Sequence, residues 1–200
     1  MVIKSEAELR ELYGYPSERA VKKSLRRLDK HALNFISKSP FVVISTAGAD
    51  GTLDSSPRGG AAGFVQVIDG RLAIPDYRGN NRLDSLKNIV ESGRVGMLFF
   101  IPGIDETLRV NGKAVMTTDE AILERFTGNF KPPLTCIVVE VEEFFLHCAK
   151  AFMRSRLWDP GIQLDKNEFP TMGQMLKDQL NSDEEPEARE DMVKRCKENL

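Results

Sequence analysis

The sequence is poor in the residues that build disulfide frameworks and metal centres. Its 200 residues include two histidines, His31 and His147, and three cysteines, Cys136, Cys148 and Cys196. The cysteines are odd in number and none is spaced as Cys-x-x-Cys, so we expect reduced thiols in a cytoplasmic protein. Because histidines are also scarce, we expect neither a zinc site nor any other metal site.

Long apolar runs and a strong net charge are also lacking. No stretch approaches the roughly 20 apolar residues that a membrane span needs. The opening MVIKSEAELRELYG is charged every few positions, so we expect no export signal. The formal net charge of −2 gives no overall field that would attract nucleic acid. We therefore expect a globular protein with neither a membrane nor a nucleic-acid partner.

The first 40 residues have the pattern of helices. Ser5 can cap EAELREL, and apolar residues at helical spacing run from Val21 to Ile36. The pair Asp29-Lys30 interrupts this spacing and could divide the stretch into two helices. Proline at position 40 ends the region, because the residue before a proline is disfavoured in a helix. We assign residues 1–40 to an N-terminal helical extension.

The middle of the chain changes to strand patterns. Apolar, β-branched runs predict strands in FVVISTA (41–47), FVQVIDGRLAIP (64–75), RVGMLFFIP (94–102) and LTCIVVEVEEFFLHC (134–148). Asp69-Gly70 predicts a two-residue hairpin, and the continuous run at 94–102 predicts a central strand. In TLRVNGKAVMT (107–117), Asn111-Gly112 fits either a hairpin or one strand with a bulge. About six strands with few βα alternations favour an antiparallel barrel with helices around it.

The later segments are more polar. TDEAILERFTG (118–128) predicts a short capped helix ending at Gly128. The carboxylates of VEVEEF (139–144) alternate along a strand, and we expect them to be solvated. Residues 159–200 form a helical, charged tail, whose end SDEEPEAREDMVKRCKENL predicts a solvated helix or partial disorder.

The segment IPDYRGNNRLDSLKNI (74–89) carries the strongest candidate site. It places arginines, asparagines and a glycine where a strand end meets a helix. Unpaired N–H groups at a helix N-terminus suit a phosphate. Asparagine amides donate hydrogen bonds to it, and arginines make planar contacts with its oxygens. The candidate residues are Arg78, Asn80, Asn81 and Arg82.

An ordinary turn is the alternative, in which an asparagine caps the helix and the arginines pair with Asp76 and Asp84. The residues of this segment leave both interpretations open. A second segment, SSPRGG (55–60), offers Ser56 and Arg58 at another strand end. Two such segments together favour one shared anionic ligand. The sequence has neither GxGxxG nor a Walker lysine loop, so Rossmann and P-loop cofactor binding are not supported.

A third segment, HCAKAFMRSRLW (147–158), spaces Lys150, Arg154 and Trp158 four residues apart. On one continuous helix these three side chains share a face. Two cations and an aromatic ring suit an anionic aromatic ligand. Periodicity alone favours a solvated basic face with Trp158 as a packing anchor.

These segments resemble the FMN-binding split-barrel superfamily related to pyridoxamine 5'-phosphate oxidase, and most closely its branch of probable FMN-dependent proteins of unassigned substrate. The matching segments span residues 41–158 in the order FVVISTAGADGTLDSSPRGG, RLAIPDYRGNNRLDSLKNI, RVGMLFFIPGIDETLRVNGKAVM and HCAKAFMRSRLW. The resemblance implies a mainly β fold with peripheral helices, built on a six-stranded antiparallel split barrel in residues 41–158. It also implies a homodimer with FMN at the subunit interface.

The resemblance assigns roles to individual residues. Asn80, Asn81 and Arg82 would hold the FMN phosphate, and Arg78 would be a second cation. Pro75 and Asp76 would lie along the ribityl chain or ring edge, with Ser56 and Arg58 beside the flavin. Thr107 would reach the phosphate or ribityl end, while Lys150, Arg154 and Trp158 would reach the partner subunit's flavin or substrate. The resemblance also favours one bulged strand at Asn111-Gly112.

The implied activity is an FMN-dependent oxidoreductase that acts on a small organic substrate. The arginine-and-histidine signature that holds pyridoxal phosphate in the true oxidases is missing, so we do not expect that reaction. The alternatives are a non-catalytic flavin-, haem- or nucleotide-binding sensor or storage protein, or a deazaflavin-dependent reductase on the same fold. The sequence identifies no catalytic residue and no substrate.

Overall fold

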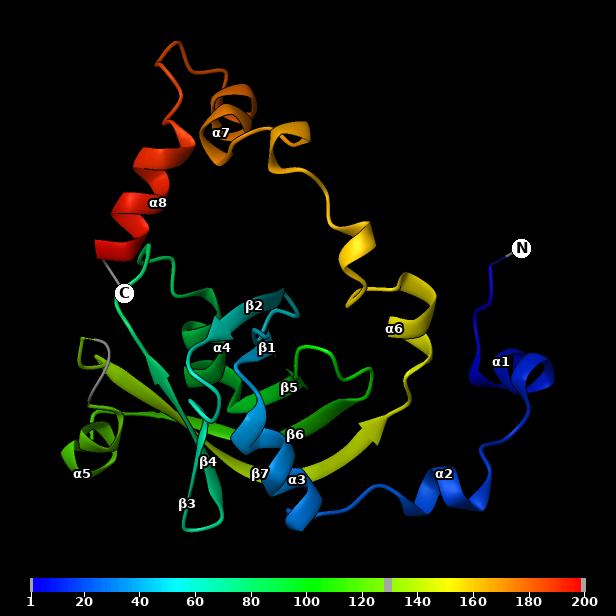
Figure 1. The fold of residues 1–200 in the computed structure, drawn as a ribbon. Coiled ribbons are helices and arrows are strands. Elements are labelled where there is room, and N and C mark those ends of the chain that lie inside the picture. Colours follow the sequence, from blue (N-terminus) through cyan, green and yellow to red (C-terminus); the bar gives the residue numbers. More distant parts are fainter. Residues whose placement is uncertain (1, 128–130, 199–200) are drawn as a thin grey trace.

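The computed structural model describes residues 2–127 and 131–198. Seven strands form one antiparallel sheet with the order β2-β1-β5-β6-β7-β4-β3 (Figure 1). Their bounds are β1 (Phe41–Ala47), β2 (Leu53–Gly59), β3 (Gln66–Ile68), β4 (Arg71–Asp76), β5 (Arg94–Phe100), β6 (Thr107–Thr117) and β7 (Thr135–His147). The predicted mainly β, antiparallel fold with helices is confirmed. The sheet has seven strands, not six, and no pairing in the described residues joins its edge strands β2 and β3.

Local turn chemistry determines two features of the sheet. Asp69 and Gly70 have φ angles of 50° and 76° and join β3 to β4, which confirms the predicted hairpin. At Asn111-Gly112 the chain does not turn: β6 continues, and its pairing with β7 shifts register there. The bulged strand is therefore the correct alternative. A Cβ on Gly112 would lie 2.2 Å from the Glu140 carbonyl oxygen, so the close approach of the two strands requires glycine.

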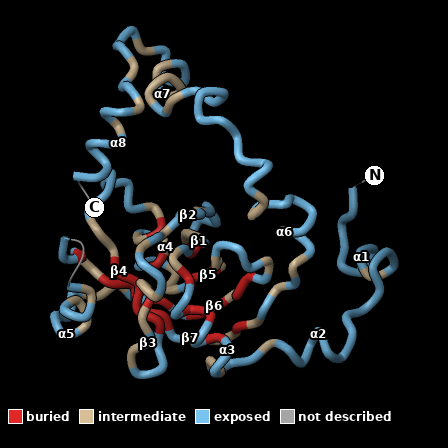
Figure 2. Tube along the Cα trace, in the orientation of Figure 1, coloured by how far each residue is buried: buried red, intermediate tan, exposed pale blue. Residues whose placement is uncertain are grey.

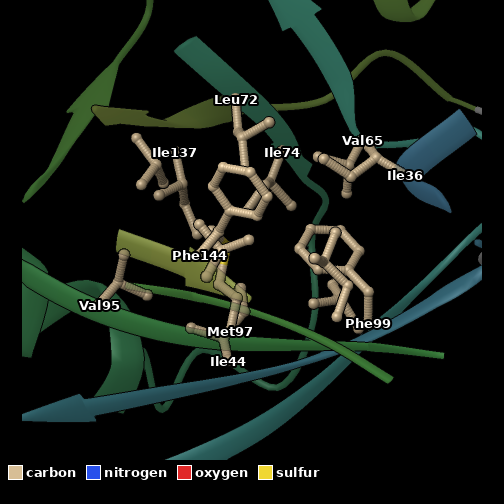
Figure 3. Close-up of a cluster of buried hydrophobic side chains, with 14 of the residues drawn as sticks. Ile36, Ile44, Val65, Leu72, Ile74, Val95, Met97, Phe99, Ile137 and Phe144 are labelled. Atoms are coloured by element: carbon tan, nitrogen blue, oxygen red, sulfur yellow. The ribbon is translucent and has the colours of Figure 1, made fainter. Parts of the chain in front are cut away.

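The core fills the concave side of the curved sheet. β5 lies between β1 and β6, as its continuous apolar run predicts, and buries alternate residues. Figure 3 shows side chains from β1, β4, β5, β7 and α3 pointing toward one another, among them Ile44, Ile74, Phe99, Ile137 and Ile36. Period-two alternation places the strand residues on one face of the sheet, where Ile36 of α3 packs against them. This core is the rigid support of the strand ends described below.

Three helices precede the sheet: α1 (Glu6–Tyr13), α2 (Glu18–Lys22) and α3 (Lys30–Lys38). Ser5 caps α1 as predicted, and Asp29 caps α3 by accepting hydrogen bonds from the His31 and Ala32 amides. The interruption at Asp29-Lys30 is thus a helix start. Within this region α3 buries Ala32, Phe35 and Ile36, whereas α1 and α2 bury none of their residues.

The remaining helices are α4 (Asp84–Ser92), α5 (Glu120–Leu123), α6 (Lys150–Ser155), α7 (Met172–Leu180) and α8 (Arg189–Glu198), with 3-10 turns η1 (Glu124–Phe126), η2 (Pro160–Ile162) and η3 (Lys166–Glu168). The predicted helix end at Gly128 lies outside the described residues. Figure 2 shows that buried residues gather in the sheet, while the chain before α3 and after α6 is exposed or only partly buried. Across the described chain, no helix is both long and apolar enough to cross a membrane.

Two of the three carboxylates of VEVEEF, Glu142 and Glu143, are paired, which corrects the expectation of solvated carboxylates for these two, whereas Glu140 is exposed as expected. Glu143 accepts hydrogen bonds from Ser24 Oγ at 2.6 Å, Arg109 at 3.1 Å and Asn111 at 3.2 Å. The Ser24 hydrogen bond is the main cause that lowers the pKa of Glu143. Glu142 forms an ion pair with Arg94. These contacts hold residue 24 against β7 although α2 itself is exposed.

Candidate functional site

The curvature of the sheet brings β2 and the end of β4 together around a cavity of about 420 Å³. Its walls are residues 54–59 of β2, residues 75–77 and 79–83 at and after the end of β4, and the first turn of α4, with Phe64 at one side. Two strands far apart in the sheet order therefore line one site. Of the predicted residues, the cavity brings together Ser56, Arg58, Pro75, Asp76, Asn80, Asn81 and Arg82.

The N-terminus of α4, at one wall of the cavity, has no side-chain cap. Leu83 occupies the N-cap position, with a left-handed φ of 62°, and Asn81 is also left-handed at 60°. Asn80 Oδ1 accepts a hydrogen bond from the Arg82 amide at 3.1 Å, so neither asparagine caps the helix. A left-handed residue other than glycine costs about 1–2 kcal/mol. The loop thus holds a strained backbone next to free helical N–H groups, which is frequent at ligand sites.

Arg82 points to its neighbour Asp84, with Nε donating to Oδ2 at 2.8 Å. This hydrogen bond raises the pKa of Arg82 and lowers the pKa of Asp84. The pairing expected for an ordinary turn is therefore present for Arg82. Both side chains are accessible to solvent, so the pair adds little stability and Arg82 can exchange Asp84 for a more highly charged anion.

Arg58 bridges the two strands that form the cavity. Its Nη2 lies 3.4 Å from the Asp76 carboxylate, while Nη1 donates to Ser56 Oγ and to the Pro57 carbonyl at 3.1 Å. Its Nε is buried and has no hydrogen-bond partner in the described chain. Burial raises the pKa of Asp76, and the Arg58 charge opposes that rise. A buried guanidinium nitrogen without a partner is costly, and an unsatisfied donor of this kind at a cavity wall is a candidate contact for a ligand.

Sequence reasoning missed Asp54 and Ser85, which also line the cavity. Ser85, in the first turn of α4, donates its hydroxyl to Asp54 on β2 and so ties the helix to the strand. Asp54 shares a face of β2 with Ser56 and Arg58, because positions two apart on a strand point the same way. This alternation was the signal that could have identified Asp54. Nothing local distinguished Ser85.

Five predicted residues lie outside this cavity lining. Arg78 belongs to the same loop but is not among the lining residues. Thr107 is buried in the ladder, opposite His147. Lys150 and Arg154 are exposed on α6, where Arg154 Nε donates to the Lys150 carbonyl at 3.1 Å. The fifth is Trp158.

The prediction that Trp158 shares a helical face with Lys150 and Arg154 is wrong. α6 ends at Ser155, and the left-handed Arg156, with φ of 53°, turns the chain away. Trp158 instead stacks on Phe152, with ring centroids 5.4 Å apart, and donates its Nε1 hydrogen to the Ile104 carbonyl at 2.9 Å. The structure therefore supports the packing role of Trp158 that periodicity favoured.

The family model described as pyridoxamine 5'-phosphate oxidase matches residues 28–148, which is more than half of the chain. The match includes every strand and every residue that lines the cavity. No curated protein matches the chain.

Several solved structures are similar to the chain. HupZ from Group A Streptococcus is 17% identical with a TM-score of 0.50, covering 60% of this chain and 93% of its own. A putative pyridoxamine 5'-phosphate oxidase from Lactobacillus delbrueckii is 19% identical with a TM-score of 0.46, covering 60% and 95%. An FAD-binding protein from Mycobacterium smegmatis is 14% identical with a TM-score of 0.44, covering 60% and 95%. At such identity the HupZ likeness shows the fold alone.

Proposed function

Because the chain belongs to the pyridoxamine 5'-phosphate oxidase family, we propose that it is an FMN-dependent oxidoreductase acting on a small organic substrate. Family membership supports a flavin-binding oxidoreductase fold. The choice of FMN, the occurrence of catalysis and the nature of the substrate are parts of the proposal. Its cavity of about 420 Å³ is within the range of about 300–1,000 Å³ that is usual for small-molecule sites.

The observation that carries the proposal is the uncapped start of α4, in the same cavity as the unpartnered Nε of Arg58. An uncapped helix N-terminus presents N–H groups and the positive end of the helix dipole, both of which favour a phosphate. A cationic donor elsewhere in the cavity provides a second fixed contact. A ligand with one phosphate and a polar middle part meets both requirements.

The predicted residues then have the following physical roles. Asn80, Asn81 and Arg82 hold the phosphate, for which Arg82 leaves Asp84, and Arg78 adds positive charge nearby. Ser56 and Arg58 hold one side of the cofactor, and Pro75 and Asp76 the ribityl chain or ring edge. FMN, when bound, supplies the redox chemistry at its flavin ring. The apolar Phe64 and Leu86 at the cavity wall would limit the access of water to that ring.

We also propose a cytoplasmic homodimer with the cofactor at the subunit interface, in which the seven-stranded sheet within residues 41–158 acts as the split barrel. The proposal keeps residues 1–40 and 159–200 as helical extensions. Lys150, Arg154 and Trp158 would contribute from the partner's side, and Thr107 would reach the phosphate or ribityl end of the cofactor. The ring contact with Phe152 and the hydrogen bond to Ile104 already fix Trp158 in position, which supports its use as a wall.

The first test compares FMN with riboflavin, which lacks the phosphate. We expect purified protein to be yellow, or to take up FMN, and to bind FMN more tightly than riboflavin. The double variant Asn81→Ala/Arg82→Ala should reduce this preference by about tenfold or more, because charge-assisted hydrogen bonds to the phosphate are lost. Arg71→Ala, at an exposed arginine on β4, is the matched control.

Fluorescence quenching of each flavin measures the two dissociation constants. An unchanged FMN-to-riboflavin ratio in the double variant would show that the phosphate lies elsewhere. Failure to bind any flavin would refute the proposed function. Titration with haem and with a deazaflavin separates the alternative cofactors, and turnover with NADH or NADPH and common acceptors separates an enzyme from a binding protein.

A further inference from the structure

Residues 19–30, here called the basic segment, carry an unusual density of positive charge. They run from α2 to the first residue of α3. The segment has one acidic residue, Asp29, and six cations, which gives it a net charge of +5. The cations are Arg19, Lys22, Lys23, Arg26, Arg27 and Lys30, and all are exposed. The whole chain has a net charge of −2, so this charge is strictly local.

Most of these cations have no anionic partner within the described residues. Lys22 pairs with Glu18 in the same helix, and Lys23 donates to the Leu146 carbonyl at 3.0 Å. The other four form no ion pair in the described chain: Arg19, Arg26, Arg27 and Lys30. Holding unpaired like charges together is unfavourable. The arrangement therefore suits an external anion.

The basic segment is nevertheless anchored to the sheet. Leu25 exchanges two backbone hydrogen bonds with Phe144 on β7, at 3.0 and 2.8 Å. Ser24 donates to Glu143, and Lys23 lies over the Phe145 ring at 4.7 Å. These contacts preorganise the segment, so a partner that binds it loses less conformational entropy than with a free chain.

Residues 183–191, here called the acidic segment, have the opposite composition. Six of these nine residues are acidic, and with Arg189 their net charge is −5. The acidic residues are Asp183, Glu184, Glu185, Glu187, Glu190 and Asp191, and all are exposed. Among them Glu187 pairs with Arg195 at 2.8 Å. The other five form no ion pair in the parts of the chain that the structure describes.

The acidic segment also has a defined conformation. Arg189 donates to the Lys166 and Phe169 carbonyls at 2.9 and 3.0 Å, which ties the segment to the chain before α7. A Cβ on Gly173 would lie 2.4 Å from the Glu187 carbonyl oxygen, so α7 packs tightly against the segment's backbone. The acidic residues thus project from a small helical unit and not from a loose tail.

Exposed apolar side chains accompany both segments. Val21 and Leu25 are exposed within the basic segment, and Leu180 and Val193 are exposed on either side of the acidic segment. Protein interfaces combine an apolar centre with a polar, charged rim. Each segment therefore has the composition of one side of a protein–protein interface, and the two sides are opposite in charge.

The two segments do not meet within one chain. Figure 1 shows α2 at the lower right and the turn between α7 and α8 at the top, on opposite sides of α6. We propose that the acidic segment of one copy docks on the basic segment of a second copy. In a two-fold dimer this contact forms twice, because each copy supplies both halves. A polyanion such as nucleic acid is a poorer partner, since the acidic segment of the same chain would repel it.

Charge reversal in the full-length protein tests this proposal. Two variants are made: the first carries Arg26→Glu/Arg27→Glu, and the second carries Glu184→Lys/Glu185→Lys. Each variant alone should self-associate at least about tenfold more weakly than the wild type at low ionic strength, because reversal leaves a net charge of only +1 on the basic segment or −1 on the acidic segment and so removes most of the attraction. High salt should weaken the wild-type association in the same direction. Arg71→Glu and Glu91→Lys, at exposed positions on the body, are controls that should leave association unchanged.

Mixing the two variants distinguishes a contact between copies from one within a chain. In the mixed dimer one contact keeps the full charges of +5 and −5, and the other brings the two reversed pairs together with opposite signs. Sedimentation across a dilution series should therefore show stronger association than for either variant alone. Circular dichroism and thermal unfolding of each variant check that its fold is intact. Wild-type association in both reversed variants, or no restoration on mixing, would overturn the proposal. So would a wild-type chain that binds a DNA duplex through the basic segment and does not self-associate.

Discussion

Replacing Arg58 with methionine tests the cavity at the residue that joins its two strands. Methionine retains an aliphatic chain but removes both the guanidinium group 3.4 Å from Asp76 and the buried, unpartnered Nε. A hydrogen bond to a charged group contributes about 1.5–3 kcal/mol. If Arg58 makes one such bond to bound FMN, its loss weakens FMN binding roughly tenfold to 150-fold.

The same substitution has a separate effect on stability. The side chains of Arg58 and Asp76 are 22% and 14% exposed, so their pair lies between a surface ion pair and a fully buried one. Removing one partner should therefore lower the free energy of unfolding by roughly 1–2 kcal/mol, between the values typical of those two classes. The pKa of Asp76, which burial already raises, should rise further because the opposing charge is gone.

Arg58→Lys is the matched variant, since it keeps the charge but loses the Nε and the planar fork. Flavin fluorescence quenching gives the FMN dissociation constant, and urea unfolding without FMN gives the stability. We expect the lysine variant to bind FMN with intermediate affinity. Wild-type affinity in a folded Arg58→Met protein would refute the placement of the cofactor beside Arg58. Wild-type affinity in Arg58→Lys alone would show that charge suffices and that the buried Nε has no role.

Two further predictions concern the scaffold. Gly112→Ala should lower the free energy of unfolding in urea by about 3 kcal/mol, because the added Cβ would lie 2.2 Å from a backbone oxygen. Gly96→Ala is the control and should cost much less, since a Cβ on Gly96 would lie no closer than 3.4 Å to another residue's atoms. A cost no larger than that of Gly96→Ala would contradict the close strand approach. The pKa of Asp76 is raised above its ordinary 3.8 in the fold, so its stabilising contribution is complete below pH 3.8 and is lost as the pH rises through the folded value. Asp76→Asn should remove that part of the pH dependence of unfolding. If the variant and the wild type had the same profile of stability against pH, Asp76 would not be its source.

Features decided within a few residues could be predicted from the sequence. Ser5 places an oxygen where the first amides of α1 need one, and the structure has this cap; the predicted break at Asp29-Lys30 is the start of α3. Asp69-Gly70 tolerates the positive φ angles of a tight hairpin, and the hairpin forms there. The resemblance likewise named seven of the residues that line the cavity. The cap and the hairpin could be predicted because the relevant forces act between near neighbours, whereas the cofactor-binding role of the lining residues stays a prediction.

Asn111-Gly112 shows where local chemistry was insufficient. Its residues suit a hairpin as well as Asp69-Gly70 does, yet β6 continues through them. The difference lies in the neighbours: β5 and β7 pair with β6 on both sides of the bulge, so turning there would break two ladders. The same limitation applies to Trp158, whose position depends on Phe152, Ile104 and the left-handed Arg156.

The sequence by itself determined the strands other than β2, the Ser5 cap, the Asp69-Gly70 hairpin and the concentration of arginine and asparagine before α4. Only the tertiary structure decided that Arg58 meets Asp76, that Asp54 accepts from Ser85, and that α4 begins at a strained, uncapped Leu83. The physical reason is distance along the chain. Side chains from β2, β4 and α4 become neighbours only when burial of the shared apolar core curves the sheet and closes these elements around one cavity.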